Sequence, residues 1–135
     1  MKTTHILVVL IFLLISSSFV DSQKKTEVYF LNCPCSFGMN VHPPGFWALP
    51  EYIDTVEIKG ENLQLLIDDQ LSKLKDTSNA PVHTLVAIVR MRNEVRDTFY
   101  SEPMFKYWHK GDKSYVDTTG FFRRAFSLFL TDWYK

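Results

Sequence analysis

Short apolar runs predict four β-strands in this chain. The runs are rich in β-branched and aromatic side chains, and polar residues, prolines or glycines separate them. Some are almost continuously apolar, which is typical of strands covered on both faces, and one alternates apolar with polar positions. A turn at residues 92–94 joins the last two runs into a β-hairpin. The predicted strands are residues 27–31, 54–59, 85–89 and 95–100.

Two later segments show the helical period. Residues 62–75 place leucines and an isoleucine on one stripe and charged side chains opposite, with Asp68 and Asp69 on the solvent side. A last helix begins after residues 117–120, which supply N-cap side chains. The two predicted core stripes are Leu63, Leu66, Ile67, Leu71 and Leu74, and Phe122, Ala125, Phe126, Phe129 and Trp133.

Residues 36–50 contain prolines and glycines that break any long helix, so at most one short helix is expected there. Within this segment, residues 43–47 read Pro-Pro-Gly-Phe-Trp. Stiff prolines that present two aromatic side chains from a loop can form a recognition surface, or the same aromatics can cap the core.

The first residues predict a secretory signal peptide. Lys2 supplies a positive charge, Ile6 to Ile15 is an unbroken apolar run, and a polar segment ends at Ser22. The run is shorter than the roughly 20 apolar residues that a membrane span needs. We therefore expect residues 1–22 to be removed and residues 23–135 to form a single domain. The last residues, 132–135, are not an endoplasmic-reticulum retrieval signal, which favours secretion.

Charge narrows the range of partners. The chain has 15 basic and 15 acidic residues and a net charge of zero at pH 7. This balance gives no electrostatic basis for binding nucleic acid, and no later apolar segment is long enough to cross a bilayer. Arg90, Arg92 and Arg96 lie around the predicted hairpin; they could recognise an acidic partner, but such a run is more often a solvated face.

The two cysteines, Cys33 and Cys35, are the residues with the plainest chemistry. They could pair with each other, stay free, bind a metal or pair with another chain. A disulfide across one intervening residue is strained and easily reduced, which suits thiol–disulfide exchange better than scaffolding. Exchange needs an accessible thiolate beside a resolving thiol, so Cys33 and Cys35 are the candidate catalytic pair.

Other roles for these residues stay open. The cysteines can form an inert local disulfide, or stay as capped thiols, on a secreted binding protein. Together with Met39 and His42 they also form a set of soft ligands suited to Cu(I) or Zn, although oxidising surroundings would compete for the thiols. No cofactor is expected. His83 and His109 have no obvious serine or acid partner in the sequence, so a Ser-His-Asp site is unsupported.

The order of these features resembles the thioredoxin-like fold. The resemblance rests on Cys33-Pro34-Cys35 after the first strand, on residues 79–82 before the run 85–89, and on the hairpin and the last helix. The single-residue gap also resembles small selenoprotein relatives of that family. The resemblance implies an α+β domain with a central mixed sheet of about four strands and a C-terminal helix.

The same resemblance implies a site. The proline that enters the third strand of that family is cis and lies against the sulfurs, which makes Pro81 the expected substrate-binding residue, after a cis Ala80–Pro81 bond. The expected function is then exchange with protein thiols or disulfides in the secretory pathway or outside the cell. The alternative is a noncatalytic extracellular binding protein with the same fold. A trans Ala80–Pro81 bond would favour the alternative.

Overall fold

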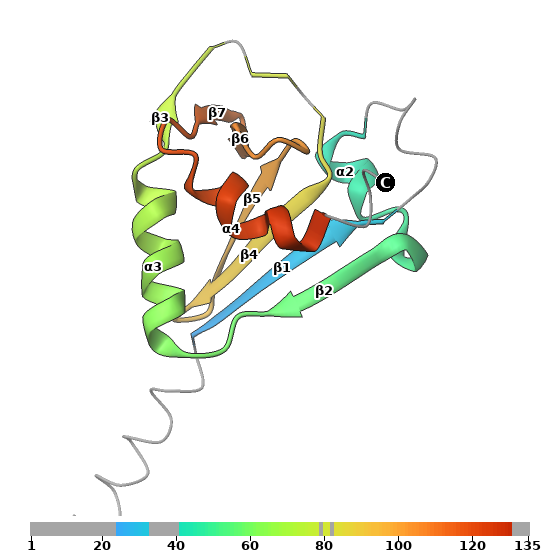
Figure 1. Cartoon of the computed structure of the whole chain (residues 1–135). Helices are drawn as coiled ribbons and strands as arrows, with labels where there is room; N and C mark the ends of the chain where they lie inside the picture. The colour runs from blue at the N-terminus through green and yellow to red at the C-terminus, as the bar shows by residue number, and fades with distance from the viewer. Residues whose placement is uncertain (1–23, 33–40, 79, 82, 131–135) are drawn as a thin grey trace, which may run out of the picture.

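The computed structural model describes residues 24–32, 41–78, 80–81 and 83–130. Its centre is one open sheet of seven strands in the order β2-β1-β4-β5-β6-β7-β3, with short helices around it (Figure 1). The strands are β1 (Lys25–Leu31), β2 (Ile53–Glu57), β3 (Lys75–Asp76), β4 (Val86–Arg92), β5 (Val95–Ser101), β6 (Tyr107–Lys110) and β7 (Lys113–Val116). The helices are α2 (Pro43–Phe46), the 3-10 turn η2 (Pro50–Tyr52), α3 (Glu61–Ser72) and α4 (Phe121–Leu130).

This architecture contradicts the predicted thioredoxin-like fold with its mixed sheet of about four strands. Every pair of neighbouring strands is antiparallel. The reason lies in the connection after β1. Parallel neighbours need a long crossover, usually a helix, but the described part of this connection, residues 41–52, holds only the four-residue α2 and the turn η2. The chain instead turns back, and β2 lies antiparallel beside β1.

Several single elements were predicted correctly. The strands β1, β2, β4 and β5 and the helices α3 and α4 lie within a few residues of their predicted ranges. The predicted hairpin turn is also confirmed, because β4 and β5 pair from Arg92 and Val95 onward. The strands β3, β6 and β7 were not predicted; they are two to four residues long.

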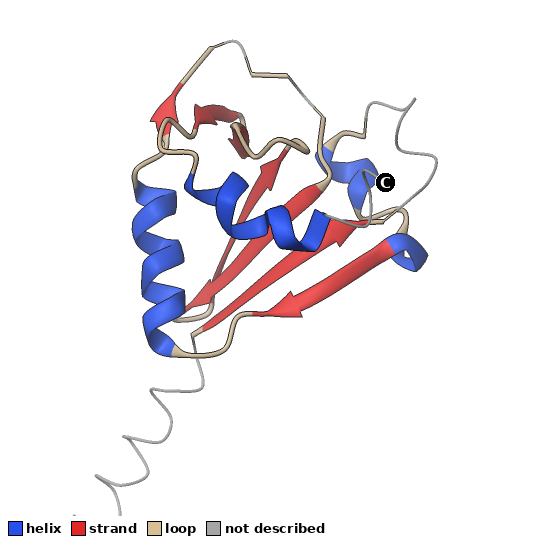
Figure 2. Ribbon diagram, viewed as in Figure 1, coloured by secondary structure: helices blue, strands red, loops and turns tan. Residues whose placement is uncertain are grey.

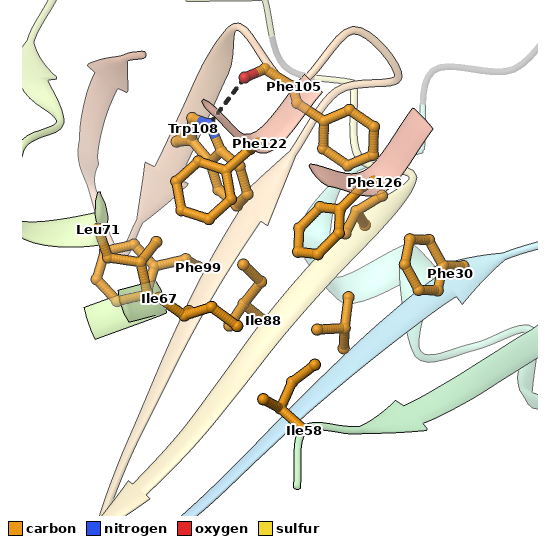
Figure 3. Close-up of a cluster of buried hydrophobic side chains, with 12 residues drawn as sticks. Phe30, Ile58, Ile67, Leu71, Ile88, Phe99, Phe105, Trp108, Phe122 and Phe126 are labelled. Carbon is orange, nitrogen blue, oxygen red and sulfur yellow. Dashed lines mark hydrogen bonds between the residues drawn. The ribbon is translucent and has the colours of Figure 1, made fainter. Parts of the chain in front are cut away.

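One face of the sheet carries the main hydrophobic core, where α3 and α4 lie (Figures 1 and 2). Trp108 of β6 and Phe122 of α4 are fully buried, and their ring centroids are 4.6 Å apart. The indole Nε1 of Trp108 donates a hydrogen bond to the Phe105 carbonyl at 3.1 Å (Figure 3). The core therefore links the β5–β6 loop to the start of α4. Its buried residues are Val28, Phe30, Ile58, Ile67, Leu71, Val86, Ile88, Phe99, Phe105, Trp108, Phe122 and Phe126.

The opposite face carries a smaller cluster of Leu31, Val41, Phe46 and Ala87. Phe46 is fully buried, and the half-buried Trp47 donates its indole N–H to the Tyr100 hydroxyl at 2.8 Å. The aromatics of residues 43–47 therefore cap this second cluster.

The predicted stripe of α3 is only partly correct. Ile67 and Leu71 are buried, but Leu63 and Leu66 are 44% and 42% exposed. The helix is rotated so that Asp68, predicted to face solvent, lies over the sheet. Its carboxylate pairs with Arg90 at 3.1 Å and with Arg92 at 2.9 Å. These two arginines therefore hold α3 to the sheet and are not a solvated face.

Candidate functional site

Among the predicted site residues, only Pro81 is described. Cys33 and Cys35 lie outside the described residues, as does Met39 of the alternative metal set, and His42 is exposed. No peptide bond in the described part of the chain is cis, and this includes Ala80–Pro81. The predicted cis bond is therefore wrong. With the antiparallel sheet, the connection before β4 no longer has the geometry that the resemblance implied.

Pro81 has a different role in the structure. Its carbonyl accepts a hydrogen bond from the His109 ring at Nε2, at 2.9 Å. A carbonyl oxygen can only accept, so Nε2 carries a proton, and the other ring nitrogen, Nδ1, shares a hydrogen bond with the Ser114 hydroxyl at 3.1 Å. His109 is thus buried and has a serine partner, contrary to the sequence-based expectation. Ser114 is its cross-strand neighbour on β7.

This serine and histidine do not form a catalytic triad. The second ring nitrogen of His109 faces a backbone carbonyl, whereas a triad places a carboxylate there to stabilise the imidazolium. The contacts instead tie the connection before β4 to the β6–β7 hairpin.

Pro81 also lines a pocket of about 490 Å³. The pocket lies between the β5–β6 loop and the turn that leads from β7 into α4. Its lining residues are Pro81, Glu102, Met104, Phe105, Lys106, Tyr107, Asp117, Thr118, Thr119, Gly120 and Arg123.

A buried carboxylate shapes the first wall of the pocket. Glu102 is 7% exposed and accepts three backbone N–H groups of its own loop. The distances are 2.6 Å from Met104, 2.7 Å from Lys106 and 3.2 Å from Tyr107. Phe105 takes a positive φ of 55° in this loop, a conformation that costs free energy for a non-glycine residue. The Glu102 carboxylate thus stabilises the tight turn of residues 102–107.

A second carboxylate shapes the opposite wall. Asp117 accepts from the Thr119 N–H at 2.8 Å, the Gly120 N–H at 3.2 Å and the Phe122 N–H at 3.4 Å. Gly120 has a φ of +67°, which favours glycine at this position. The predicted N-cap segment is therefore confirmed: the Thr119 hydroxyl accepts from the Phe121 N–H at 3.1 Å, and Asp117 accepts from Phe122 and from the turn before α4.

Two cationic side chains at the pocket remain available to a ligand. Arg123 is exposed, and within the described part of the chain it has no hydrogen bond or ion pair. Lys106 is also exposed, and its ammonium lies 5.2 Å from the centroid of the Tyr107 ring. The charged groups that remain available to a ligand are therefore positive, beside the apolar surfaces of Met104, Phe105 and Tyr107.

This arrangement suits binding rather than acid–base chemistry. Both carboxylates already accept several N–H groups, and the described residues that line the pocket include no cysteine or histidine. The described residues also contain no group of three metal-ligating side chains. The N-cap segment is recognisable in the sequence, but Glu102 is not, because its partners are main-chain amides that leave no side-chain pattern. Arg123 was not predicted either, since it lies between two stripe positions of a predicted helix.

No protein-family model, curated protein or solved structure matches this chain. Within the described ranges, none of the helices combines the length and the apolar character that crossing a membrane requires.

Proposed function

We propose that this is a secreted, noncatalytic binding protein that holds a small amphipathic anion in the pocket between residues 102–107 and 117–123. The ligand class is an apolar body that carries one carboxylate or a similar group. The observation that carries this proposal is the lining: apolar walls and two available cations, with both carboxylates engaged by their own backbone.

The apolar part of the lining supports an apolar ligand body. The pocket volume of about 490 Å³ lies within the range of known small-molecule sites. Met104 is 46% exposed, and a ligand that covers it removes apolar surface from water, which contributes roughly 25 cal/mol per Å².

The cations support an anionic group on the ligand. A guanidinium can bind a carboxylate through two parallel N–H groups, and Arg123 has no competing partner among the described residues. The Lys106 ammonium adds a second positive charge on the loop opposite.

Calorimetric titration with octanoate tests this assignment, with octanol and octylamine as neutral and cationic probes of the same chain length. We expect octanoate to bind most tightly. The double variant Lys106→Gln/Arg123→Gln should weaken octanoate about tenfold, equivalent to ~1.4 kcal/mol, and should leave octanol nearly unchanged. Arg96→Gln, which removes one positive charge far from the pocket lining, is the matched control. Equal affinities for all three probes would contradict the proposal.

Thiol–disulfide exchange by Cys33 and Cys35 stays a separate prediction. Turnover of a model disulfide that is lost in Cys33→Ser would favour it. Unchanged octanoate binding by Cys33→Ser/Cys35→Ser, together with no turnover by the wild-type protein, would favour the binding function alone.

A further inference from the structure

A second hollow lies along β5, where the sheet has a free edge. Strand β6 pairs with β5 only at Tyr100 and Ser101. The preceding part of β5, residues 95–99, has β4 on one side, and no described strand pairs with its other side. Figure 1 shows β6 and β7 beside one end of β5 only.

The hairpin register identifies the backbone groups at this edge. Asn93 and Glu94 form a two-residue turn with φ values of 50° and 67°, the geometry of a type I′ turn. Such a turn makes Arg92 and Val95 a hydrogen-bonded pair, and hydrogen-bonded pairs then alternate along the ladder. The N–H and C=O groups of Arg96 and Thr98 therefore point away from β4, toward the free edge.

This edge lies in a groove of about 560 Å³. The turn that joins β6 to β7 forms one wall, and Tyr100 and Tyr115 also line the groove. The lining residues are Arg96, Asp97, Thr98, Tyr100, Lys110, Gly111, Asp112, Lys113 and Tyr115.

The available charge in the groove is mainly positive. The Asp97 carboxylate already pairs with Lys110 at 2.9 Å and with Arg90 at 3.1 Å. Arg96 and Lys113 are exposed, and the Arg96 guanidinium lies 6.0 Å from the Trp47 ring. Asp112, in the turn, is the remaining acid of the lining.

We propose that the free edge of β5 binds an acidic, extended peptide segment of a partner protein, which adds to the sheet as a short strand. Main-chain hydrogen bonds to Arg96 and Thr98 would supply affinity, and acidic side chains would pair with Arg96 and Lys113. A second copy of this chain fits less well, because two-fold pairing of this edge would bring the same cations together. This surface is separate from the pocket at residues 102–107, so each proposal can fail without the other.

The test uses a capped hexapeptide of alternating glutamate and valine, titrated into the full secreted chain by calorimetry and by amide-resolved hydrogen exchange. We expect the peptide to bind and to slow exchange of the Arg96 and Thr98 amides. N-methylation of the peptide amides that face β5 should weaken binding at least about tenfold, since hydrogen bonds are lost without any change in the protein. Arg96→Gln/Lys113→Gln should weaken the glutamate peptide and reduce its salt dependence.

A capped peptide of alternating lysine and valine is the control, and we expect it to bind at least tenfold more weakly. Absence of binding, equal binding of the N-methylated peptide, or protection at β2 with none at β5 would each overturn the proposal.

Discussion

The pocket at residues 102–107 and 117–123 and the groove beside β5 are hollows of similar size, about 490 and 560 Å³, but they arise from opposite uses of the backbone. At the pocket, Glu102 and Asp117 accept the N–H groups of both walls. At the groove, a neighbouring strand ends early, and the main-chain groups of Arg96 and Thr98 are left without a strand partner in the described structure.

The difference separates two kinds of recognition. Where the backbone is satisfied internally, a ligand can be held only by side chains, here apolar surfaces with Lys106 and Arg123. Where the backbone is open, any extended chain can form hydrogen bonds, and specificity comes from nearby charges. Ligand affinity at the pocket should therefore depend strongly on the side chains of its walls. Peptide affinity at the groove should depend mainly on the backbone amides and the charges of the peptide.

The largest effect should come from removing the support beneath the pocket. Trp108→Ala deletes a fully buried indole that packs on Phe122 and hydrogen-bonds the Phe105 carbonyl. We expect the free energy of unfolding to fall by about 3–5 kcal/mol, measured by urea denaturation. Trp47→Ala, on the opposite face and only half-buried, is the control and should cost clearly less. An equal loss of unfolding free energy in the two variants would contradict this prediction, because the two hydrophobic clusters would then contribute equally to stability.

The next effect concerns the wall that Glu102 holds. Glu102→Ala leaves the amides of Met104, Lys106 and Tyr107 without their acceptor. Unfolding free energy should fall by about 2–3 kcal/mol, and octanoate affinity should fall with it. Glu102→Gln keeps one acceptor oxygen and should lie between the wild type and the alanine variant. An exposed glutamate elsewhere, Glu51→Ala, serves as the control, and an equal effect there would contradict this role.

A smaller effect is expected at the opposite wall. Asp117→Ala removes the acceptor of the Thr119, Gly120 and Phe122 amides at the start of α4 and should cost about 1–2 kcal/mol, whereas Asp117→Ser should retain part of this capping. Asp112→Ala, in the exposed β6–β7 turn, should change unfolding by less than 0.5 kcal/mol. If the serine variant were as unstable as the alanine variant, the capping interpretation would be wrong.

The smallest effect belongs to the groove and depends on pH. The hydrogen bond and charge of Lys110, with a further contribution from Arg90, hold the pKa of Asp97 below its usual value, against an opposing effect of burial. A lowered carboxyl pKa contributes stability above the unfolded-state value, near pH 4, and this contribution is lost as the pH falls through the lower folded-state pKa. Asp97 is partly exposed, so we expect less than about 1 kcal/mol. Urea titrations of wild type and Asp97→Asn should converge between pH 5 and pH 2, and a constant gap would contradict the assignment.

The sequence predicted local elements well and their arrangement poorly. Val28 to Leu31 and the run 85–89 are continuously apolar, and Phe122 and Phe126 follow the helical period; each of these signals corresponds to a largely buried element. The direction of pairing depends on contacts between distant residues, such as Val28 with Val56 and Ile88. A short apolar run does not encode these contacts, so the mixed sheet was a wrong prediction.

The candidate site was predictable only in part. The segment 117–120 carries a recognisable N-cap pattern, and the structure uses it. The partners of His109 became visible only with the β6–β7 register, because Ser114 faces it across a strand pair that the sequence did not predict. Thiol–disulfide exchange by Cys33 and Cys35 stays a prediction, because both residues lie outside the described part of the chain.

The most direct test of the ligand pocket is an amide-resolved NMR titration of the protein with octanoate. The proposal predicts saturable chemical-shift changes concentrated in residues 102–107 and 117–123, which Lys106→Gln/Arg123→Gln strongly reduces and Arg96→Gln does not. Shift changes centred on the exposed leucines Leu63, Leu65 and Leu66 of α3, or spread evenly over the surface, would contradict it.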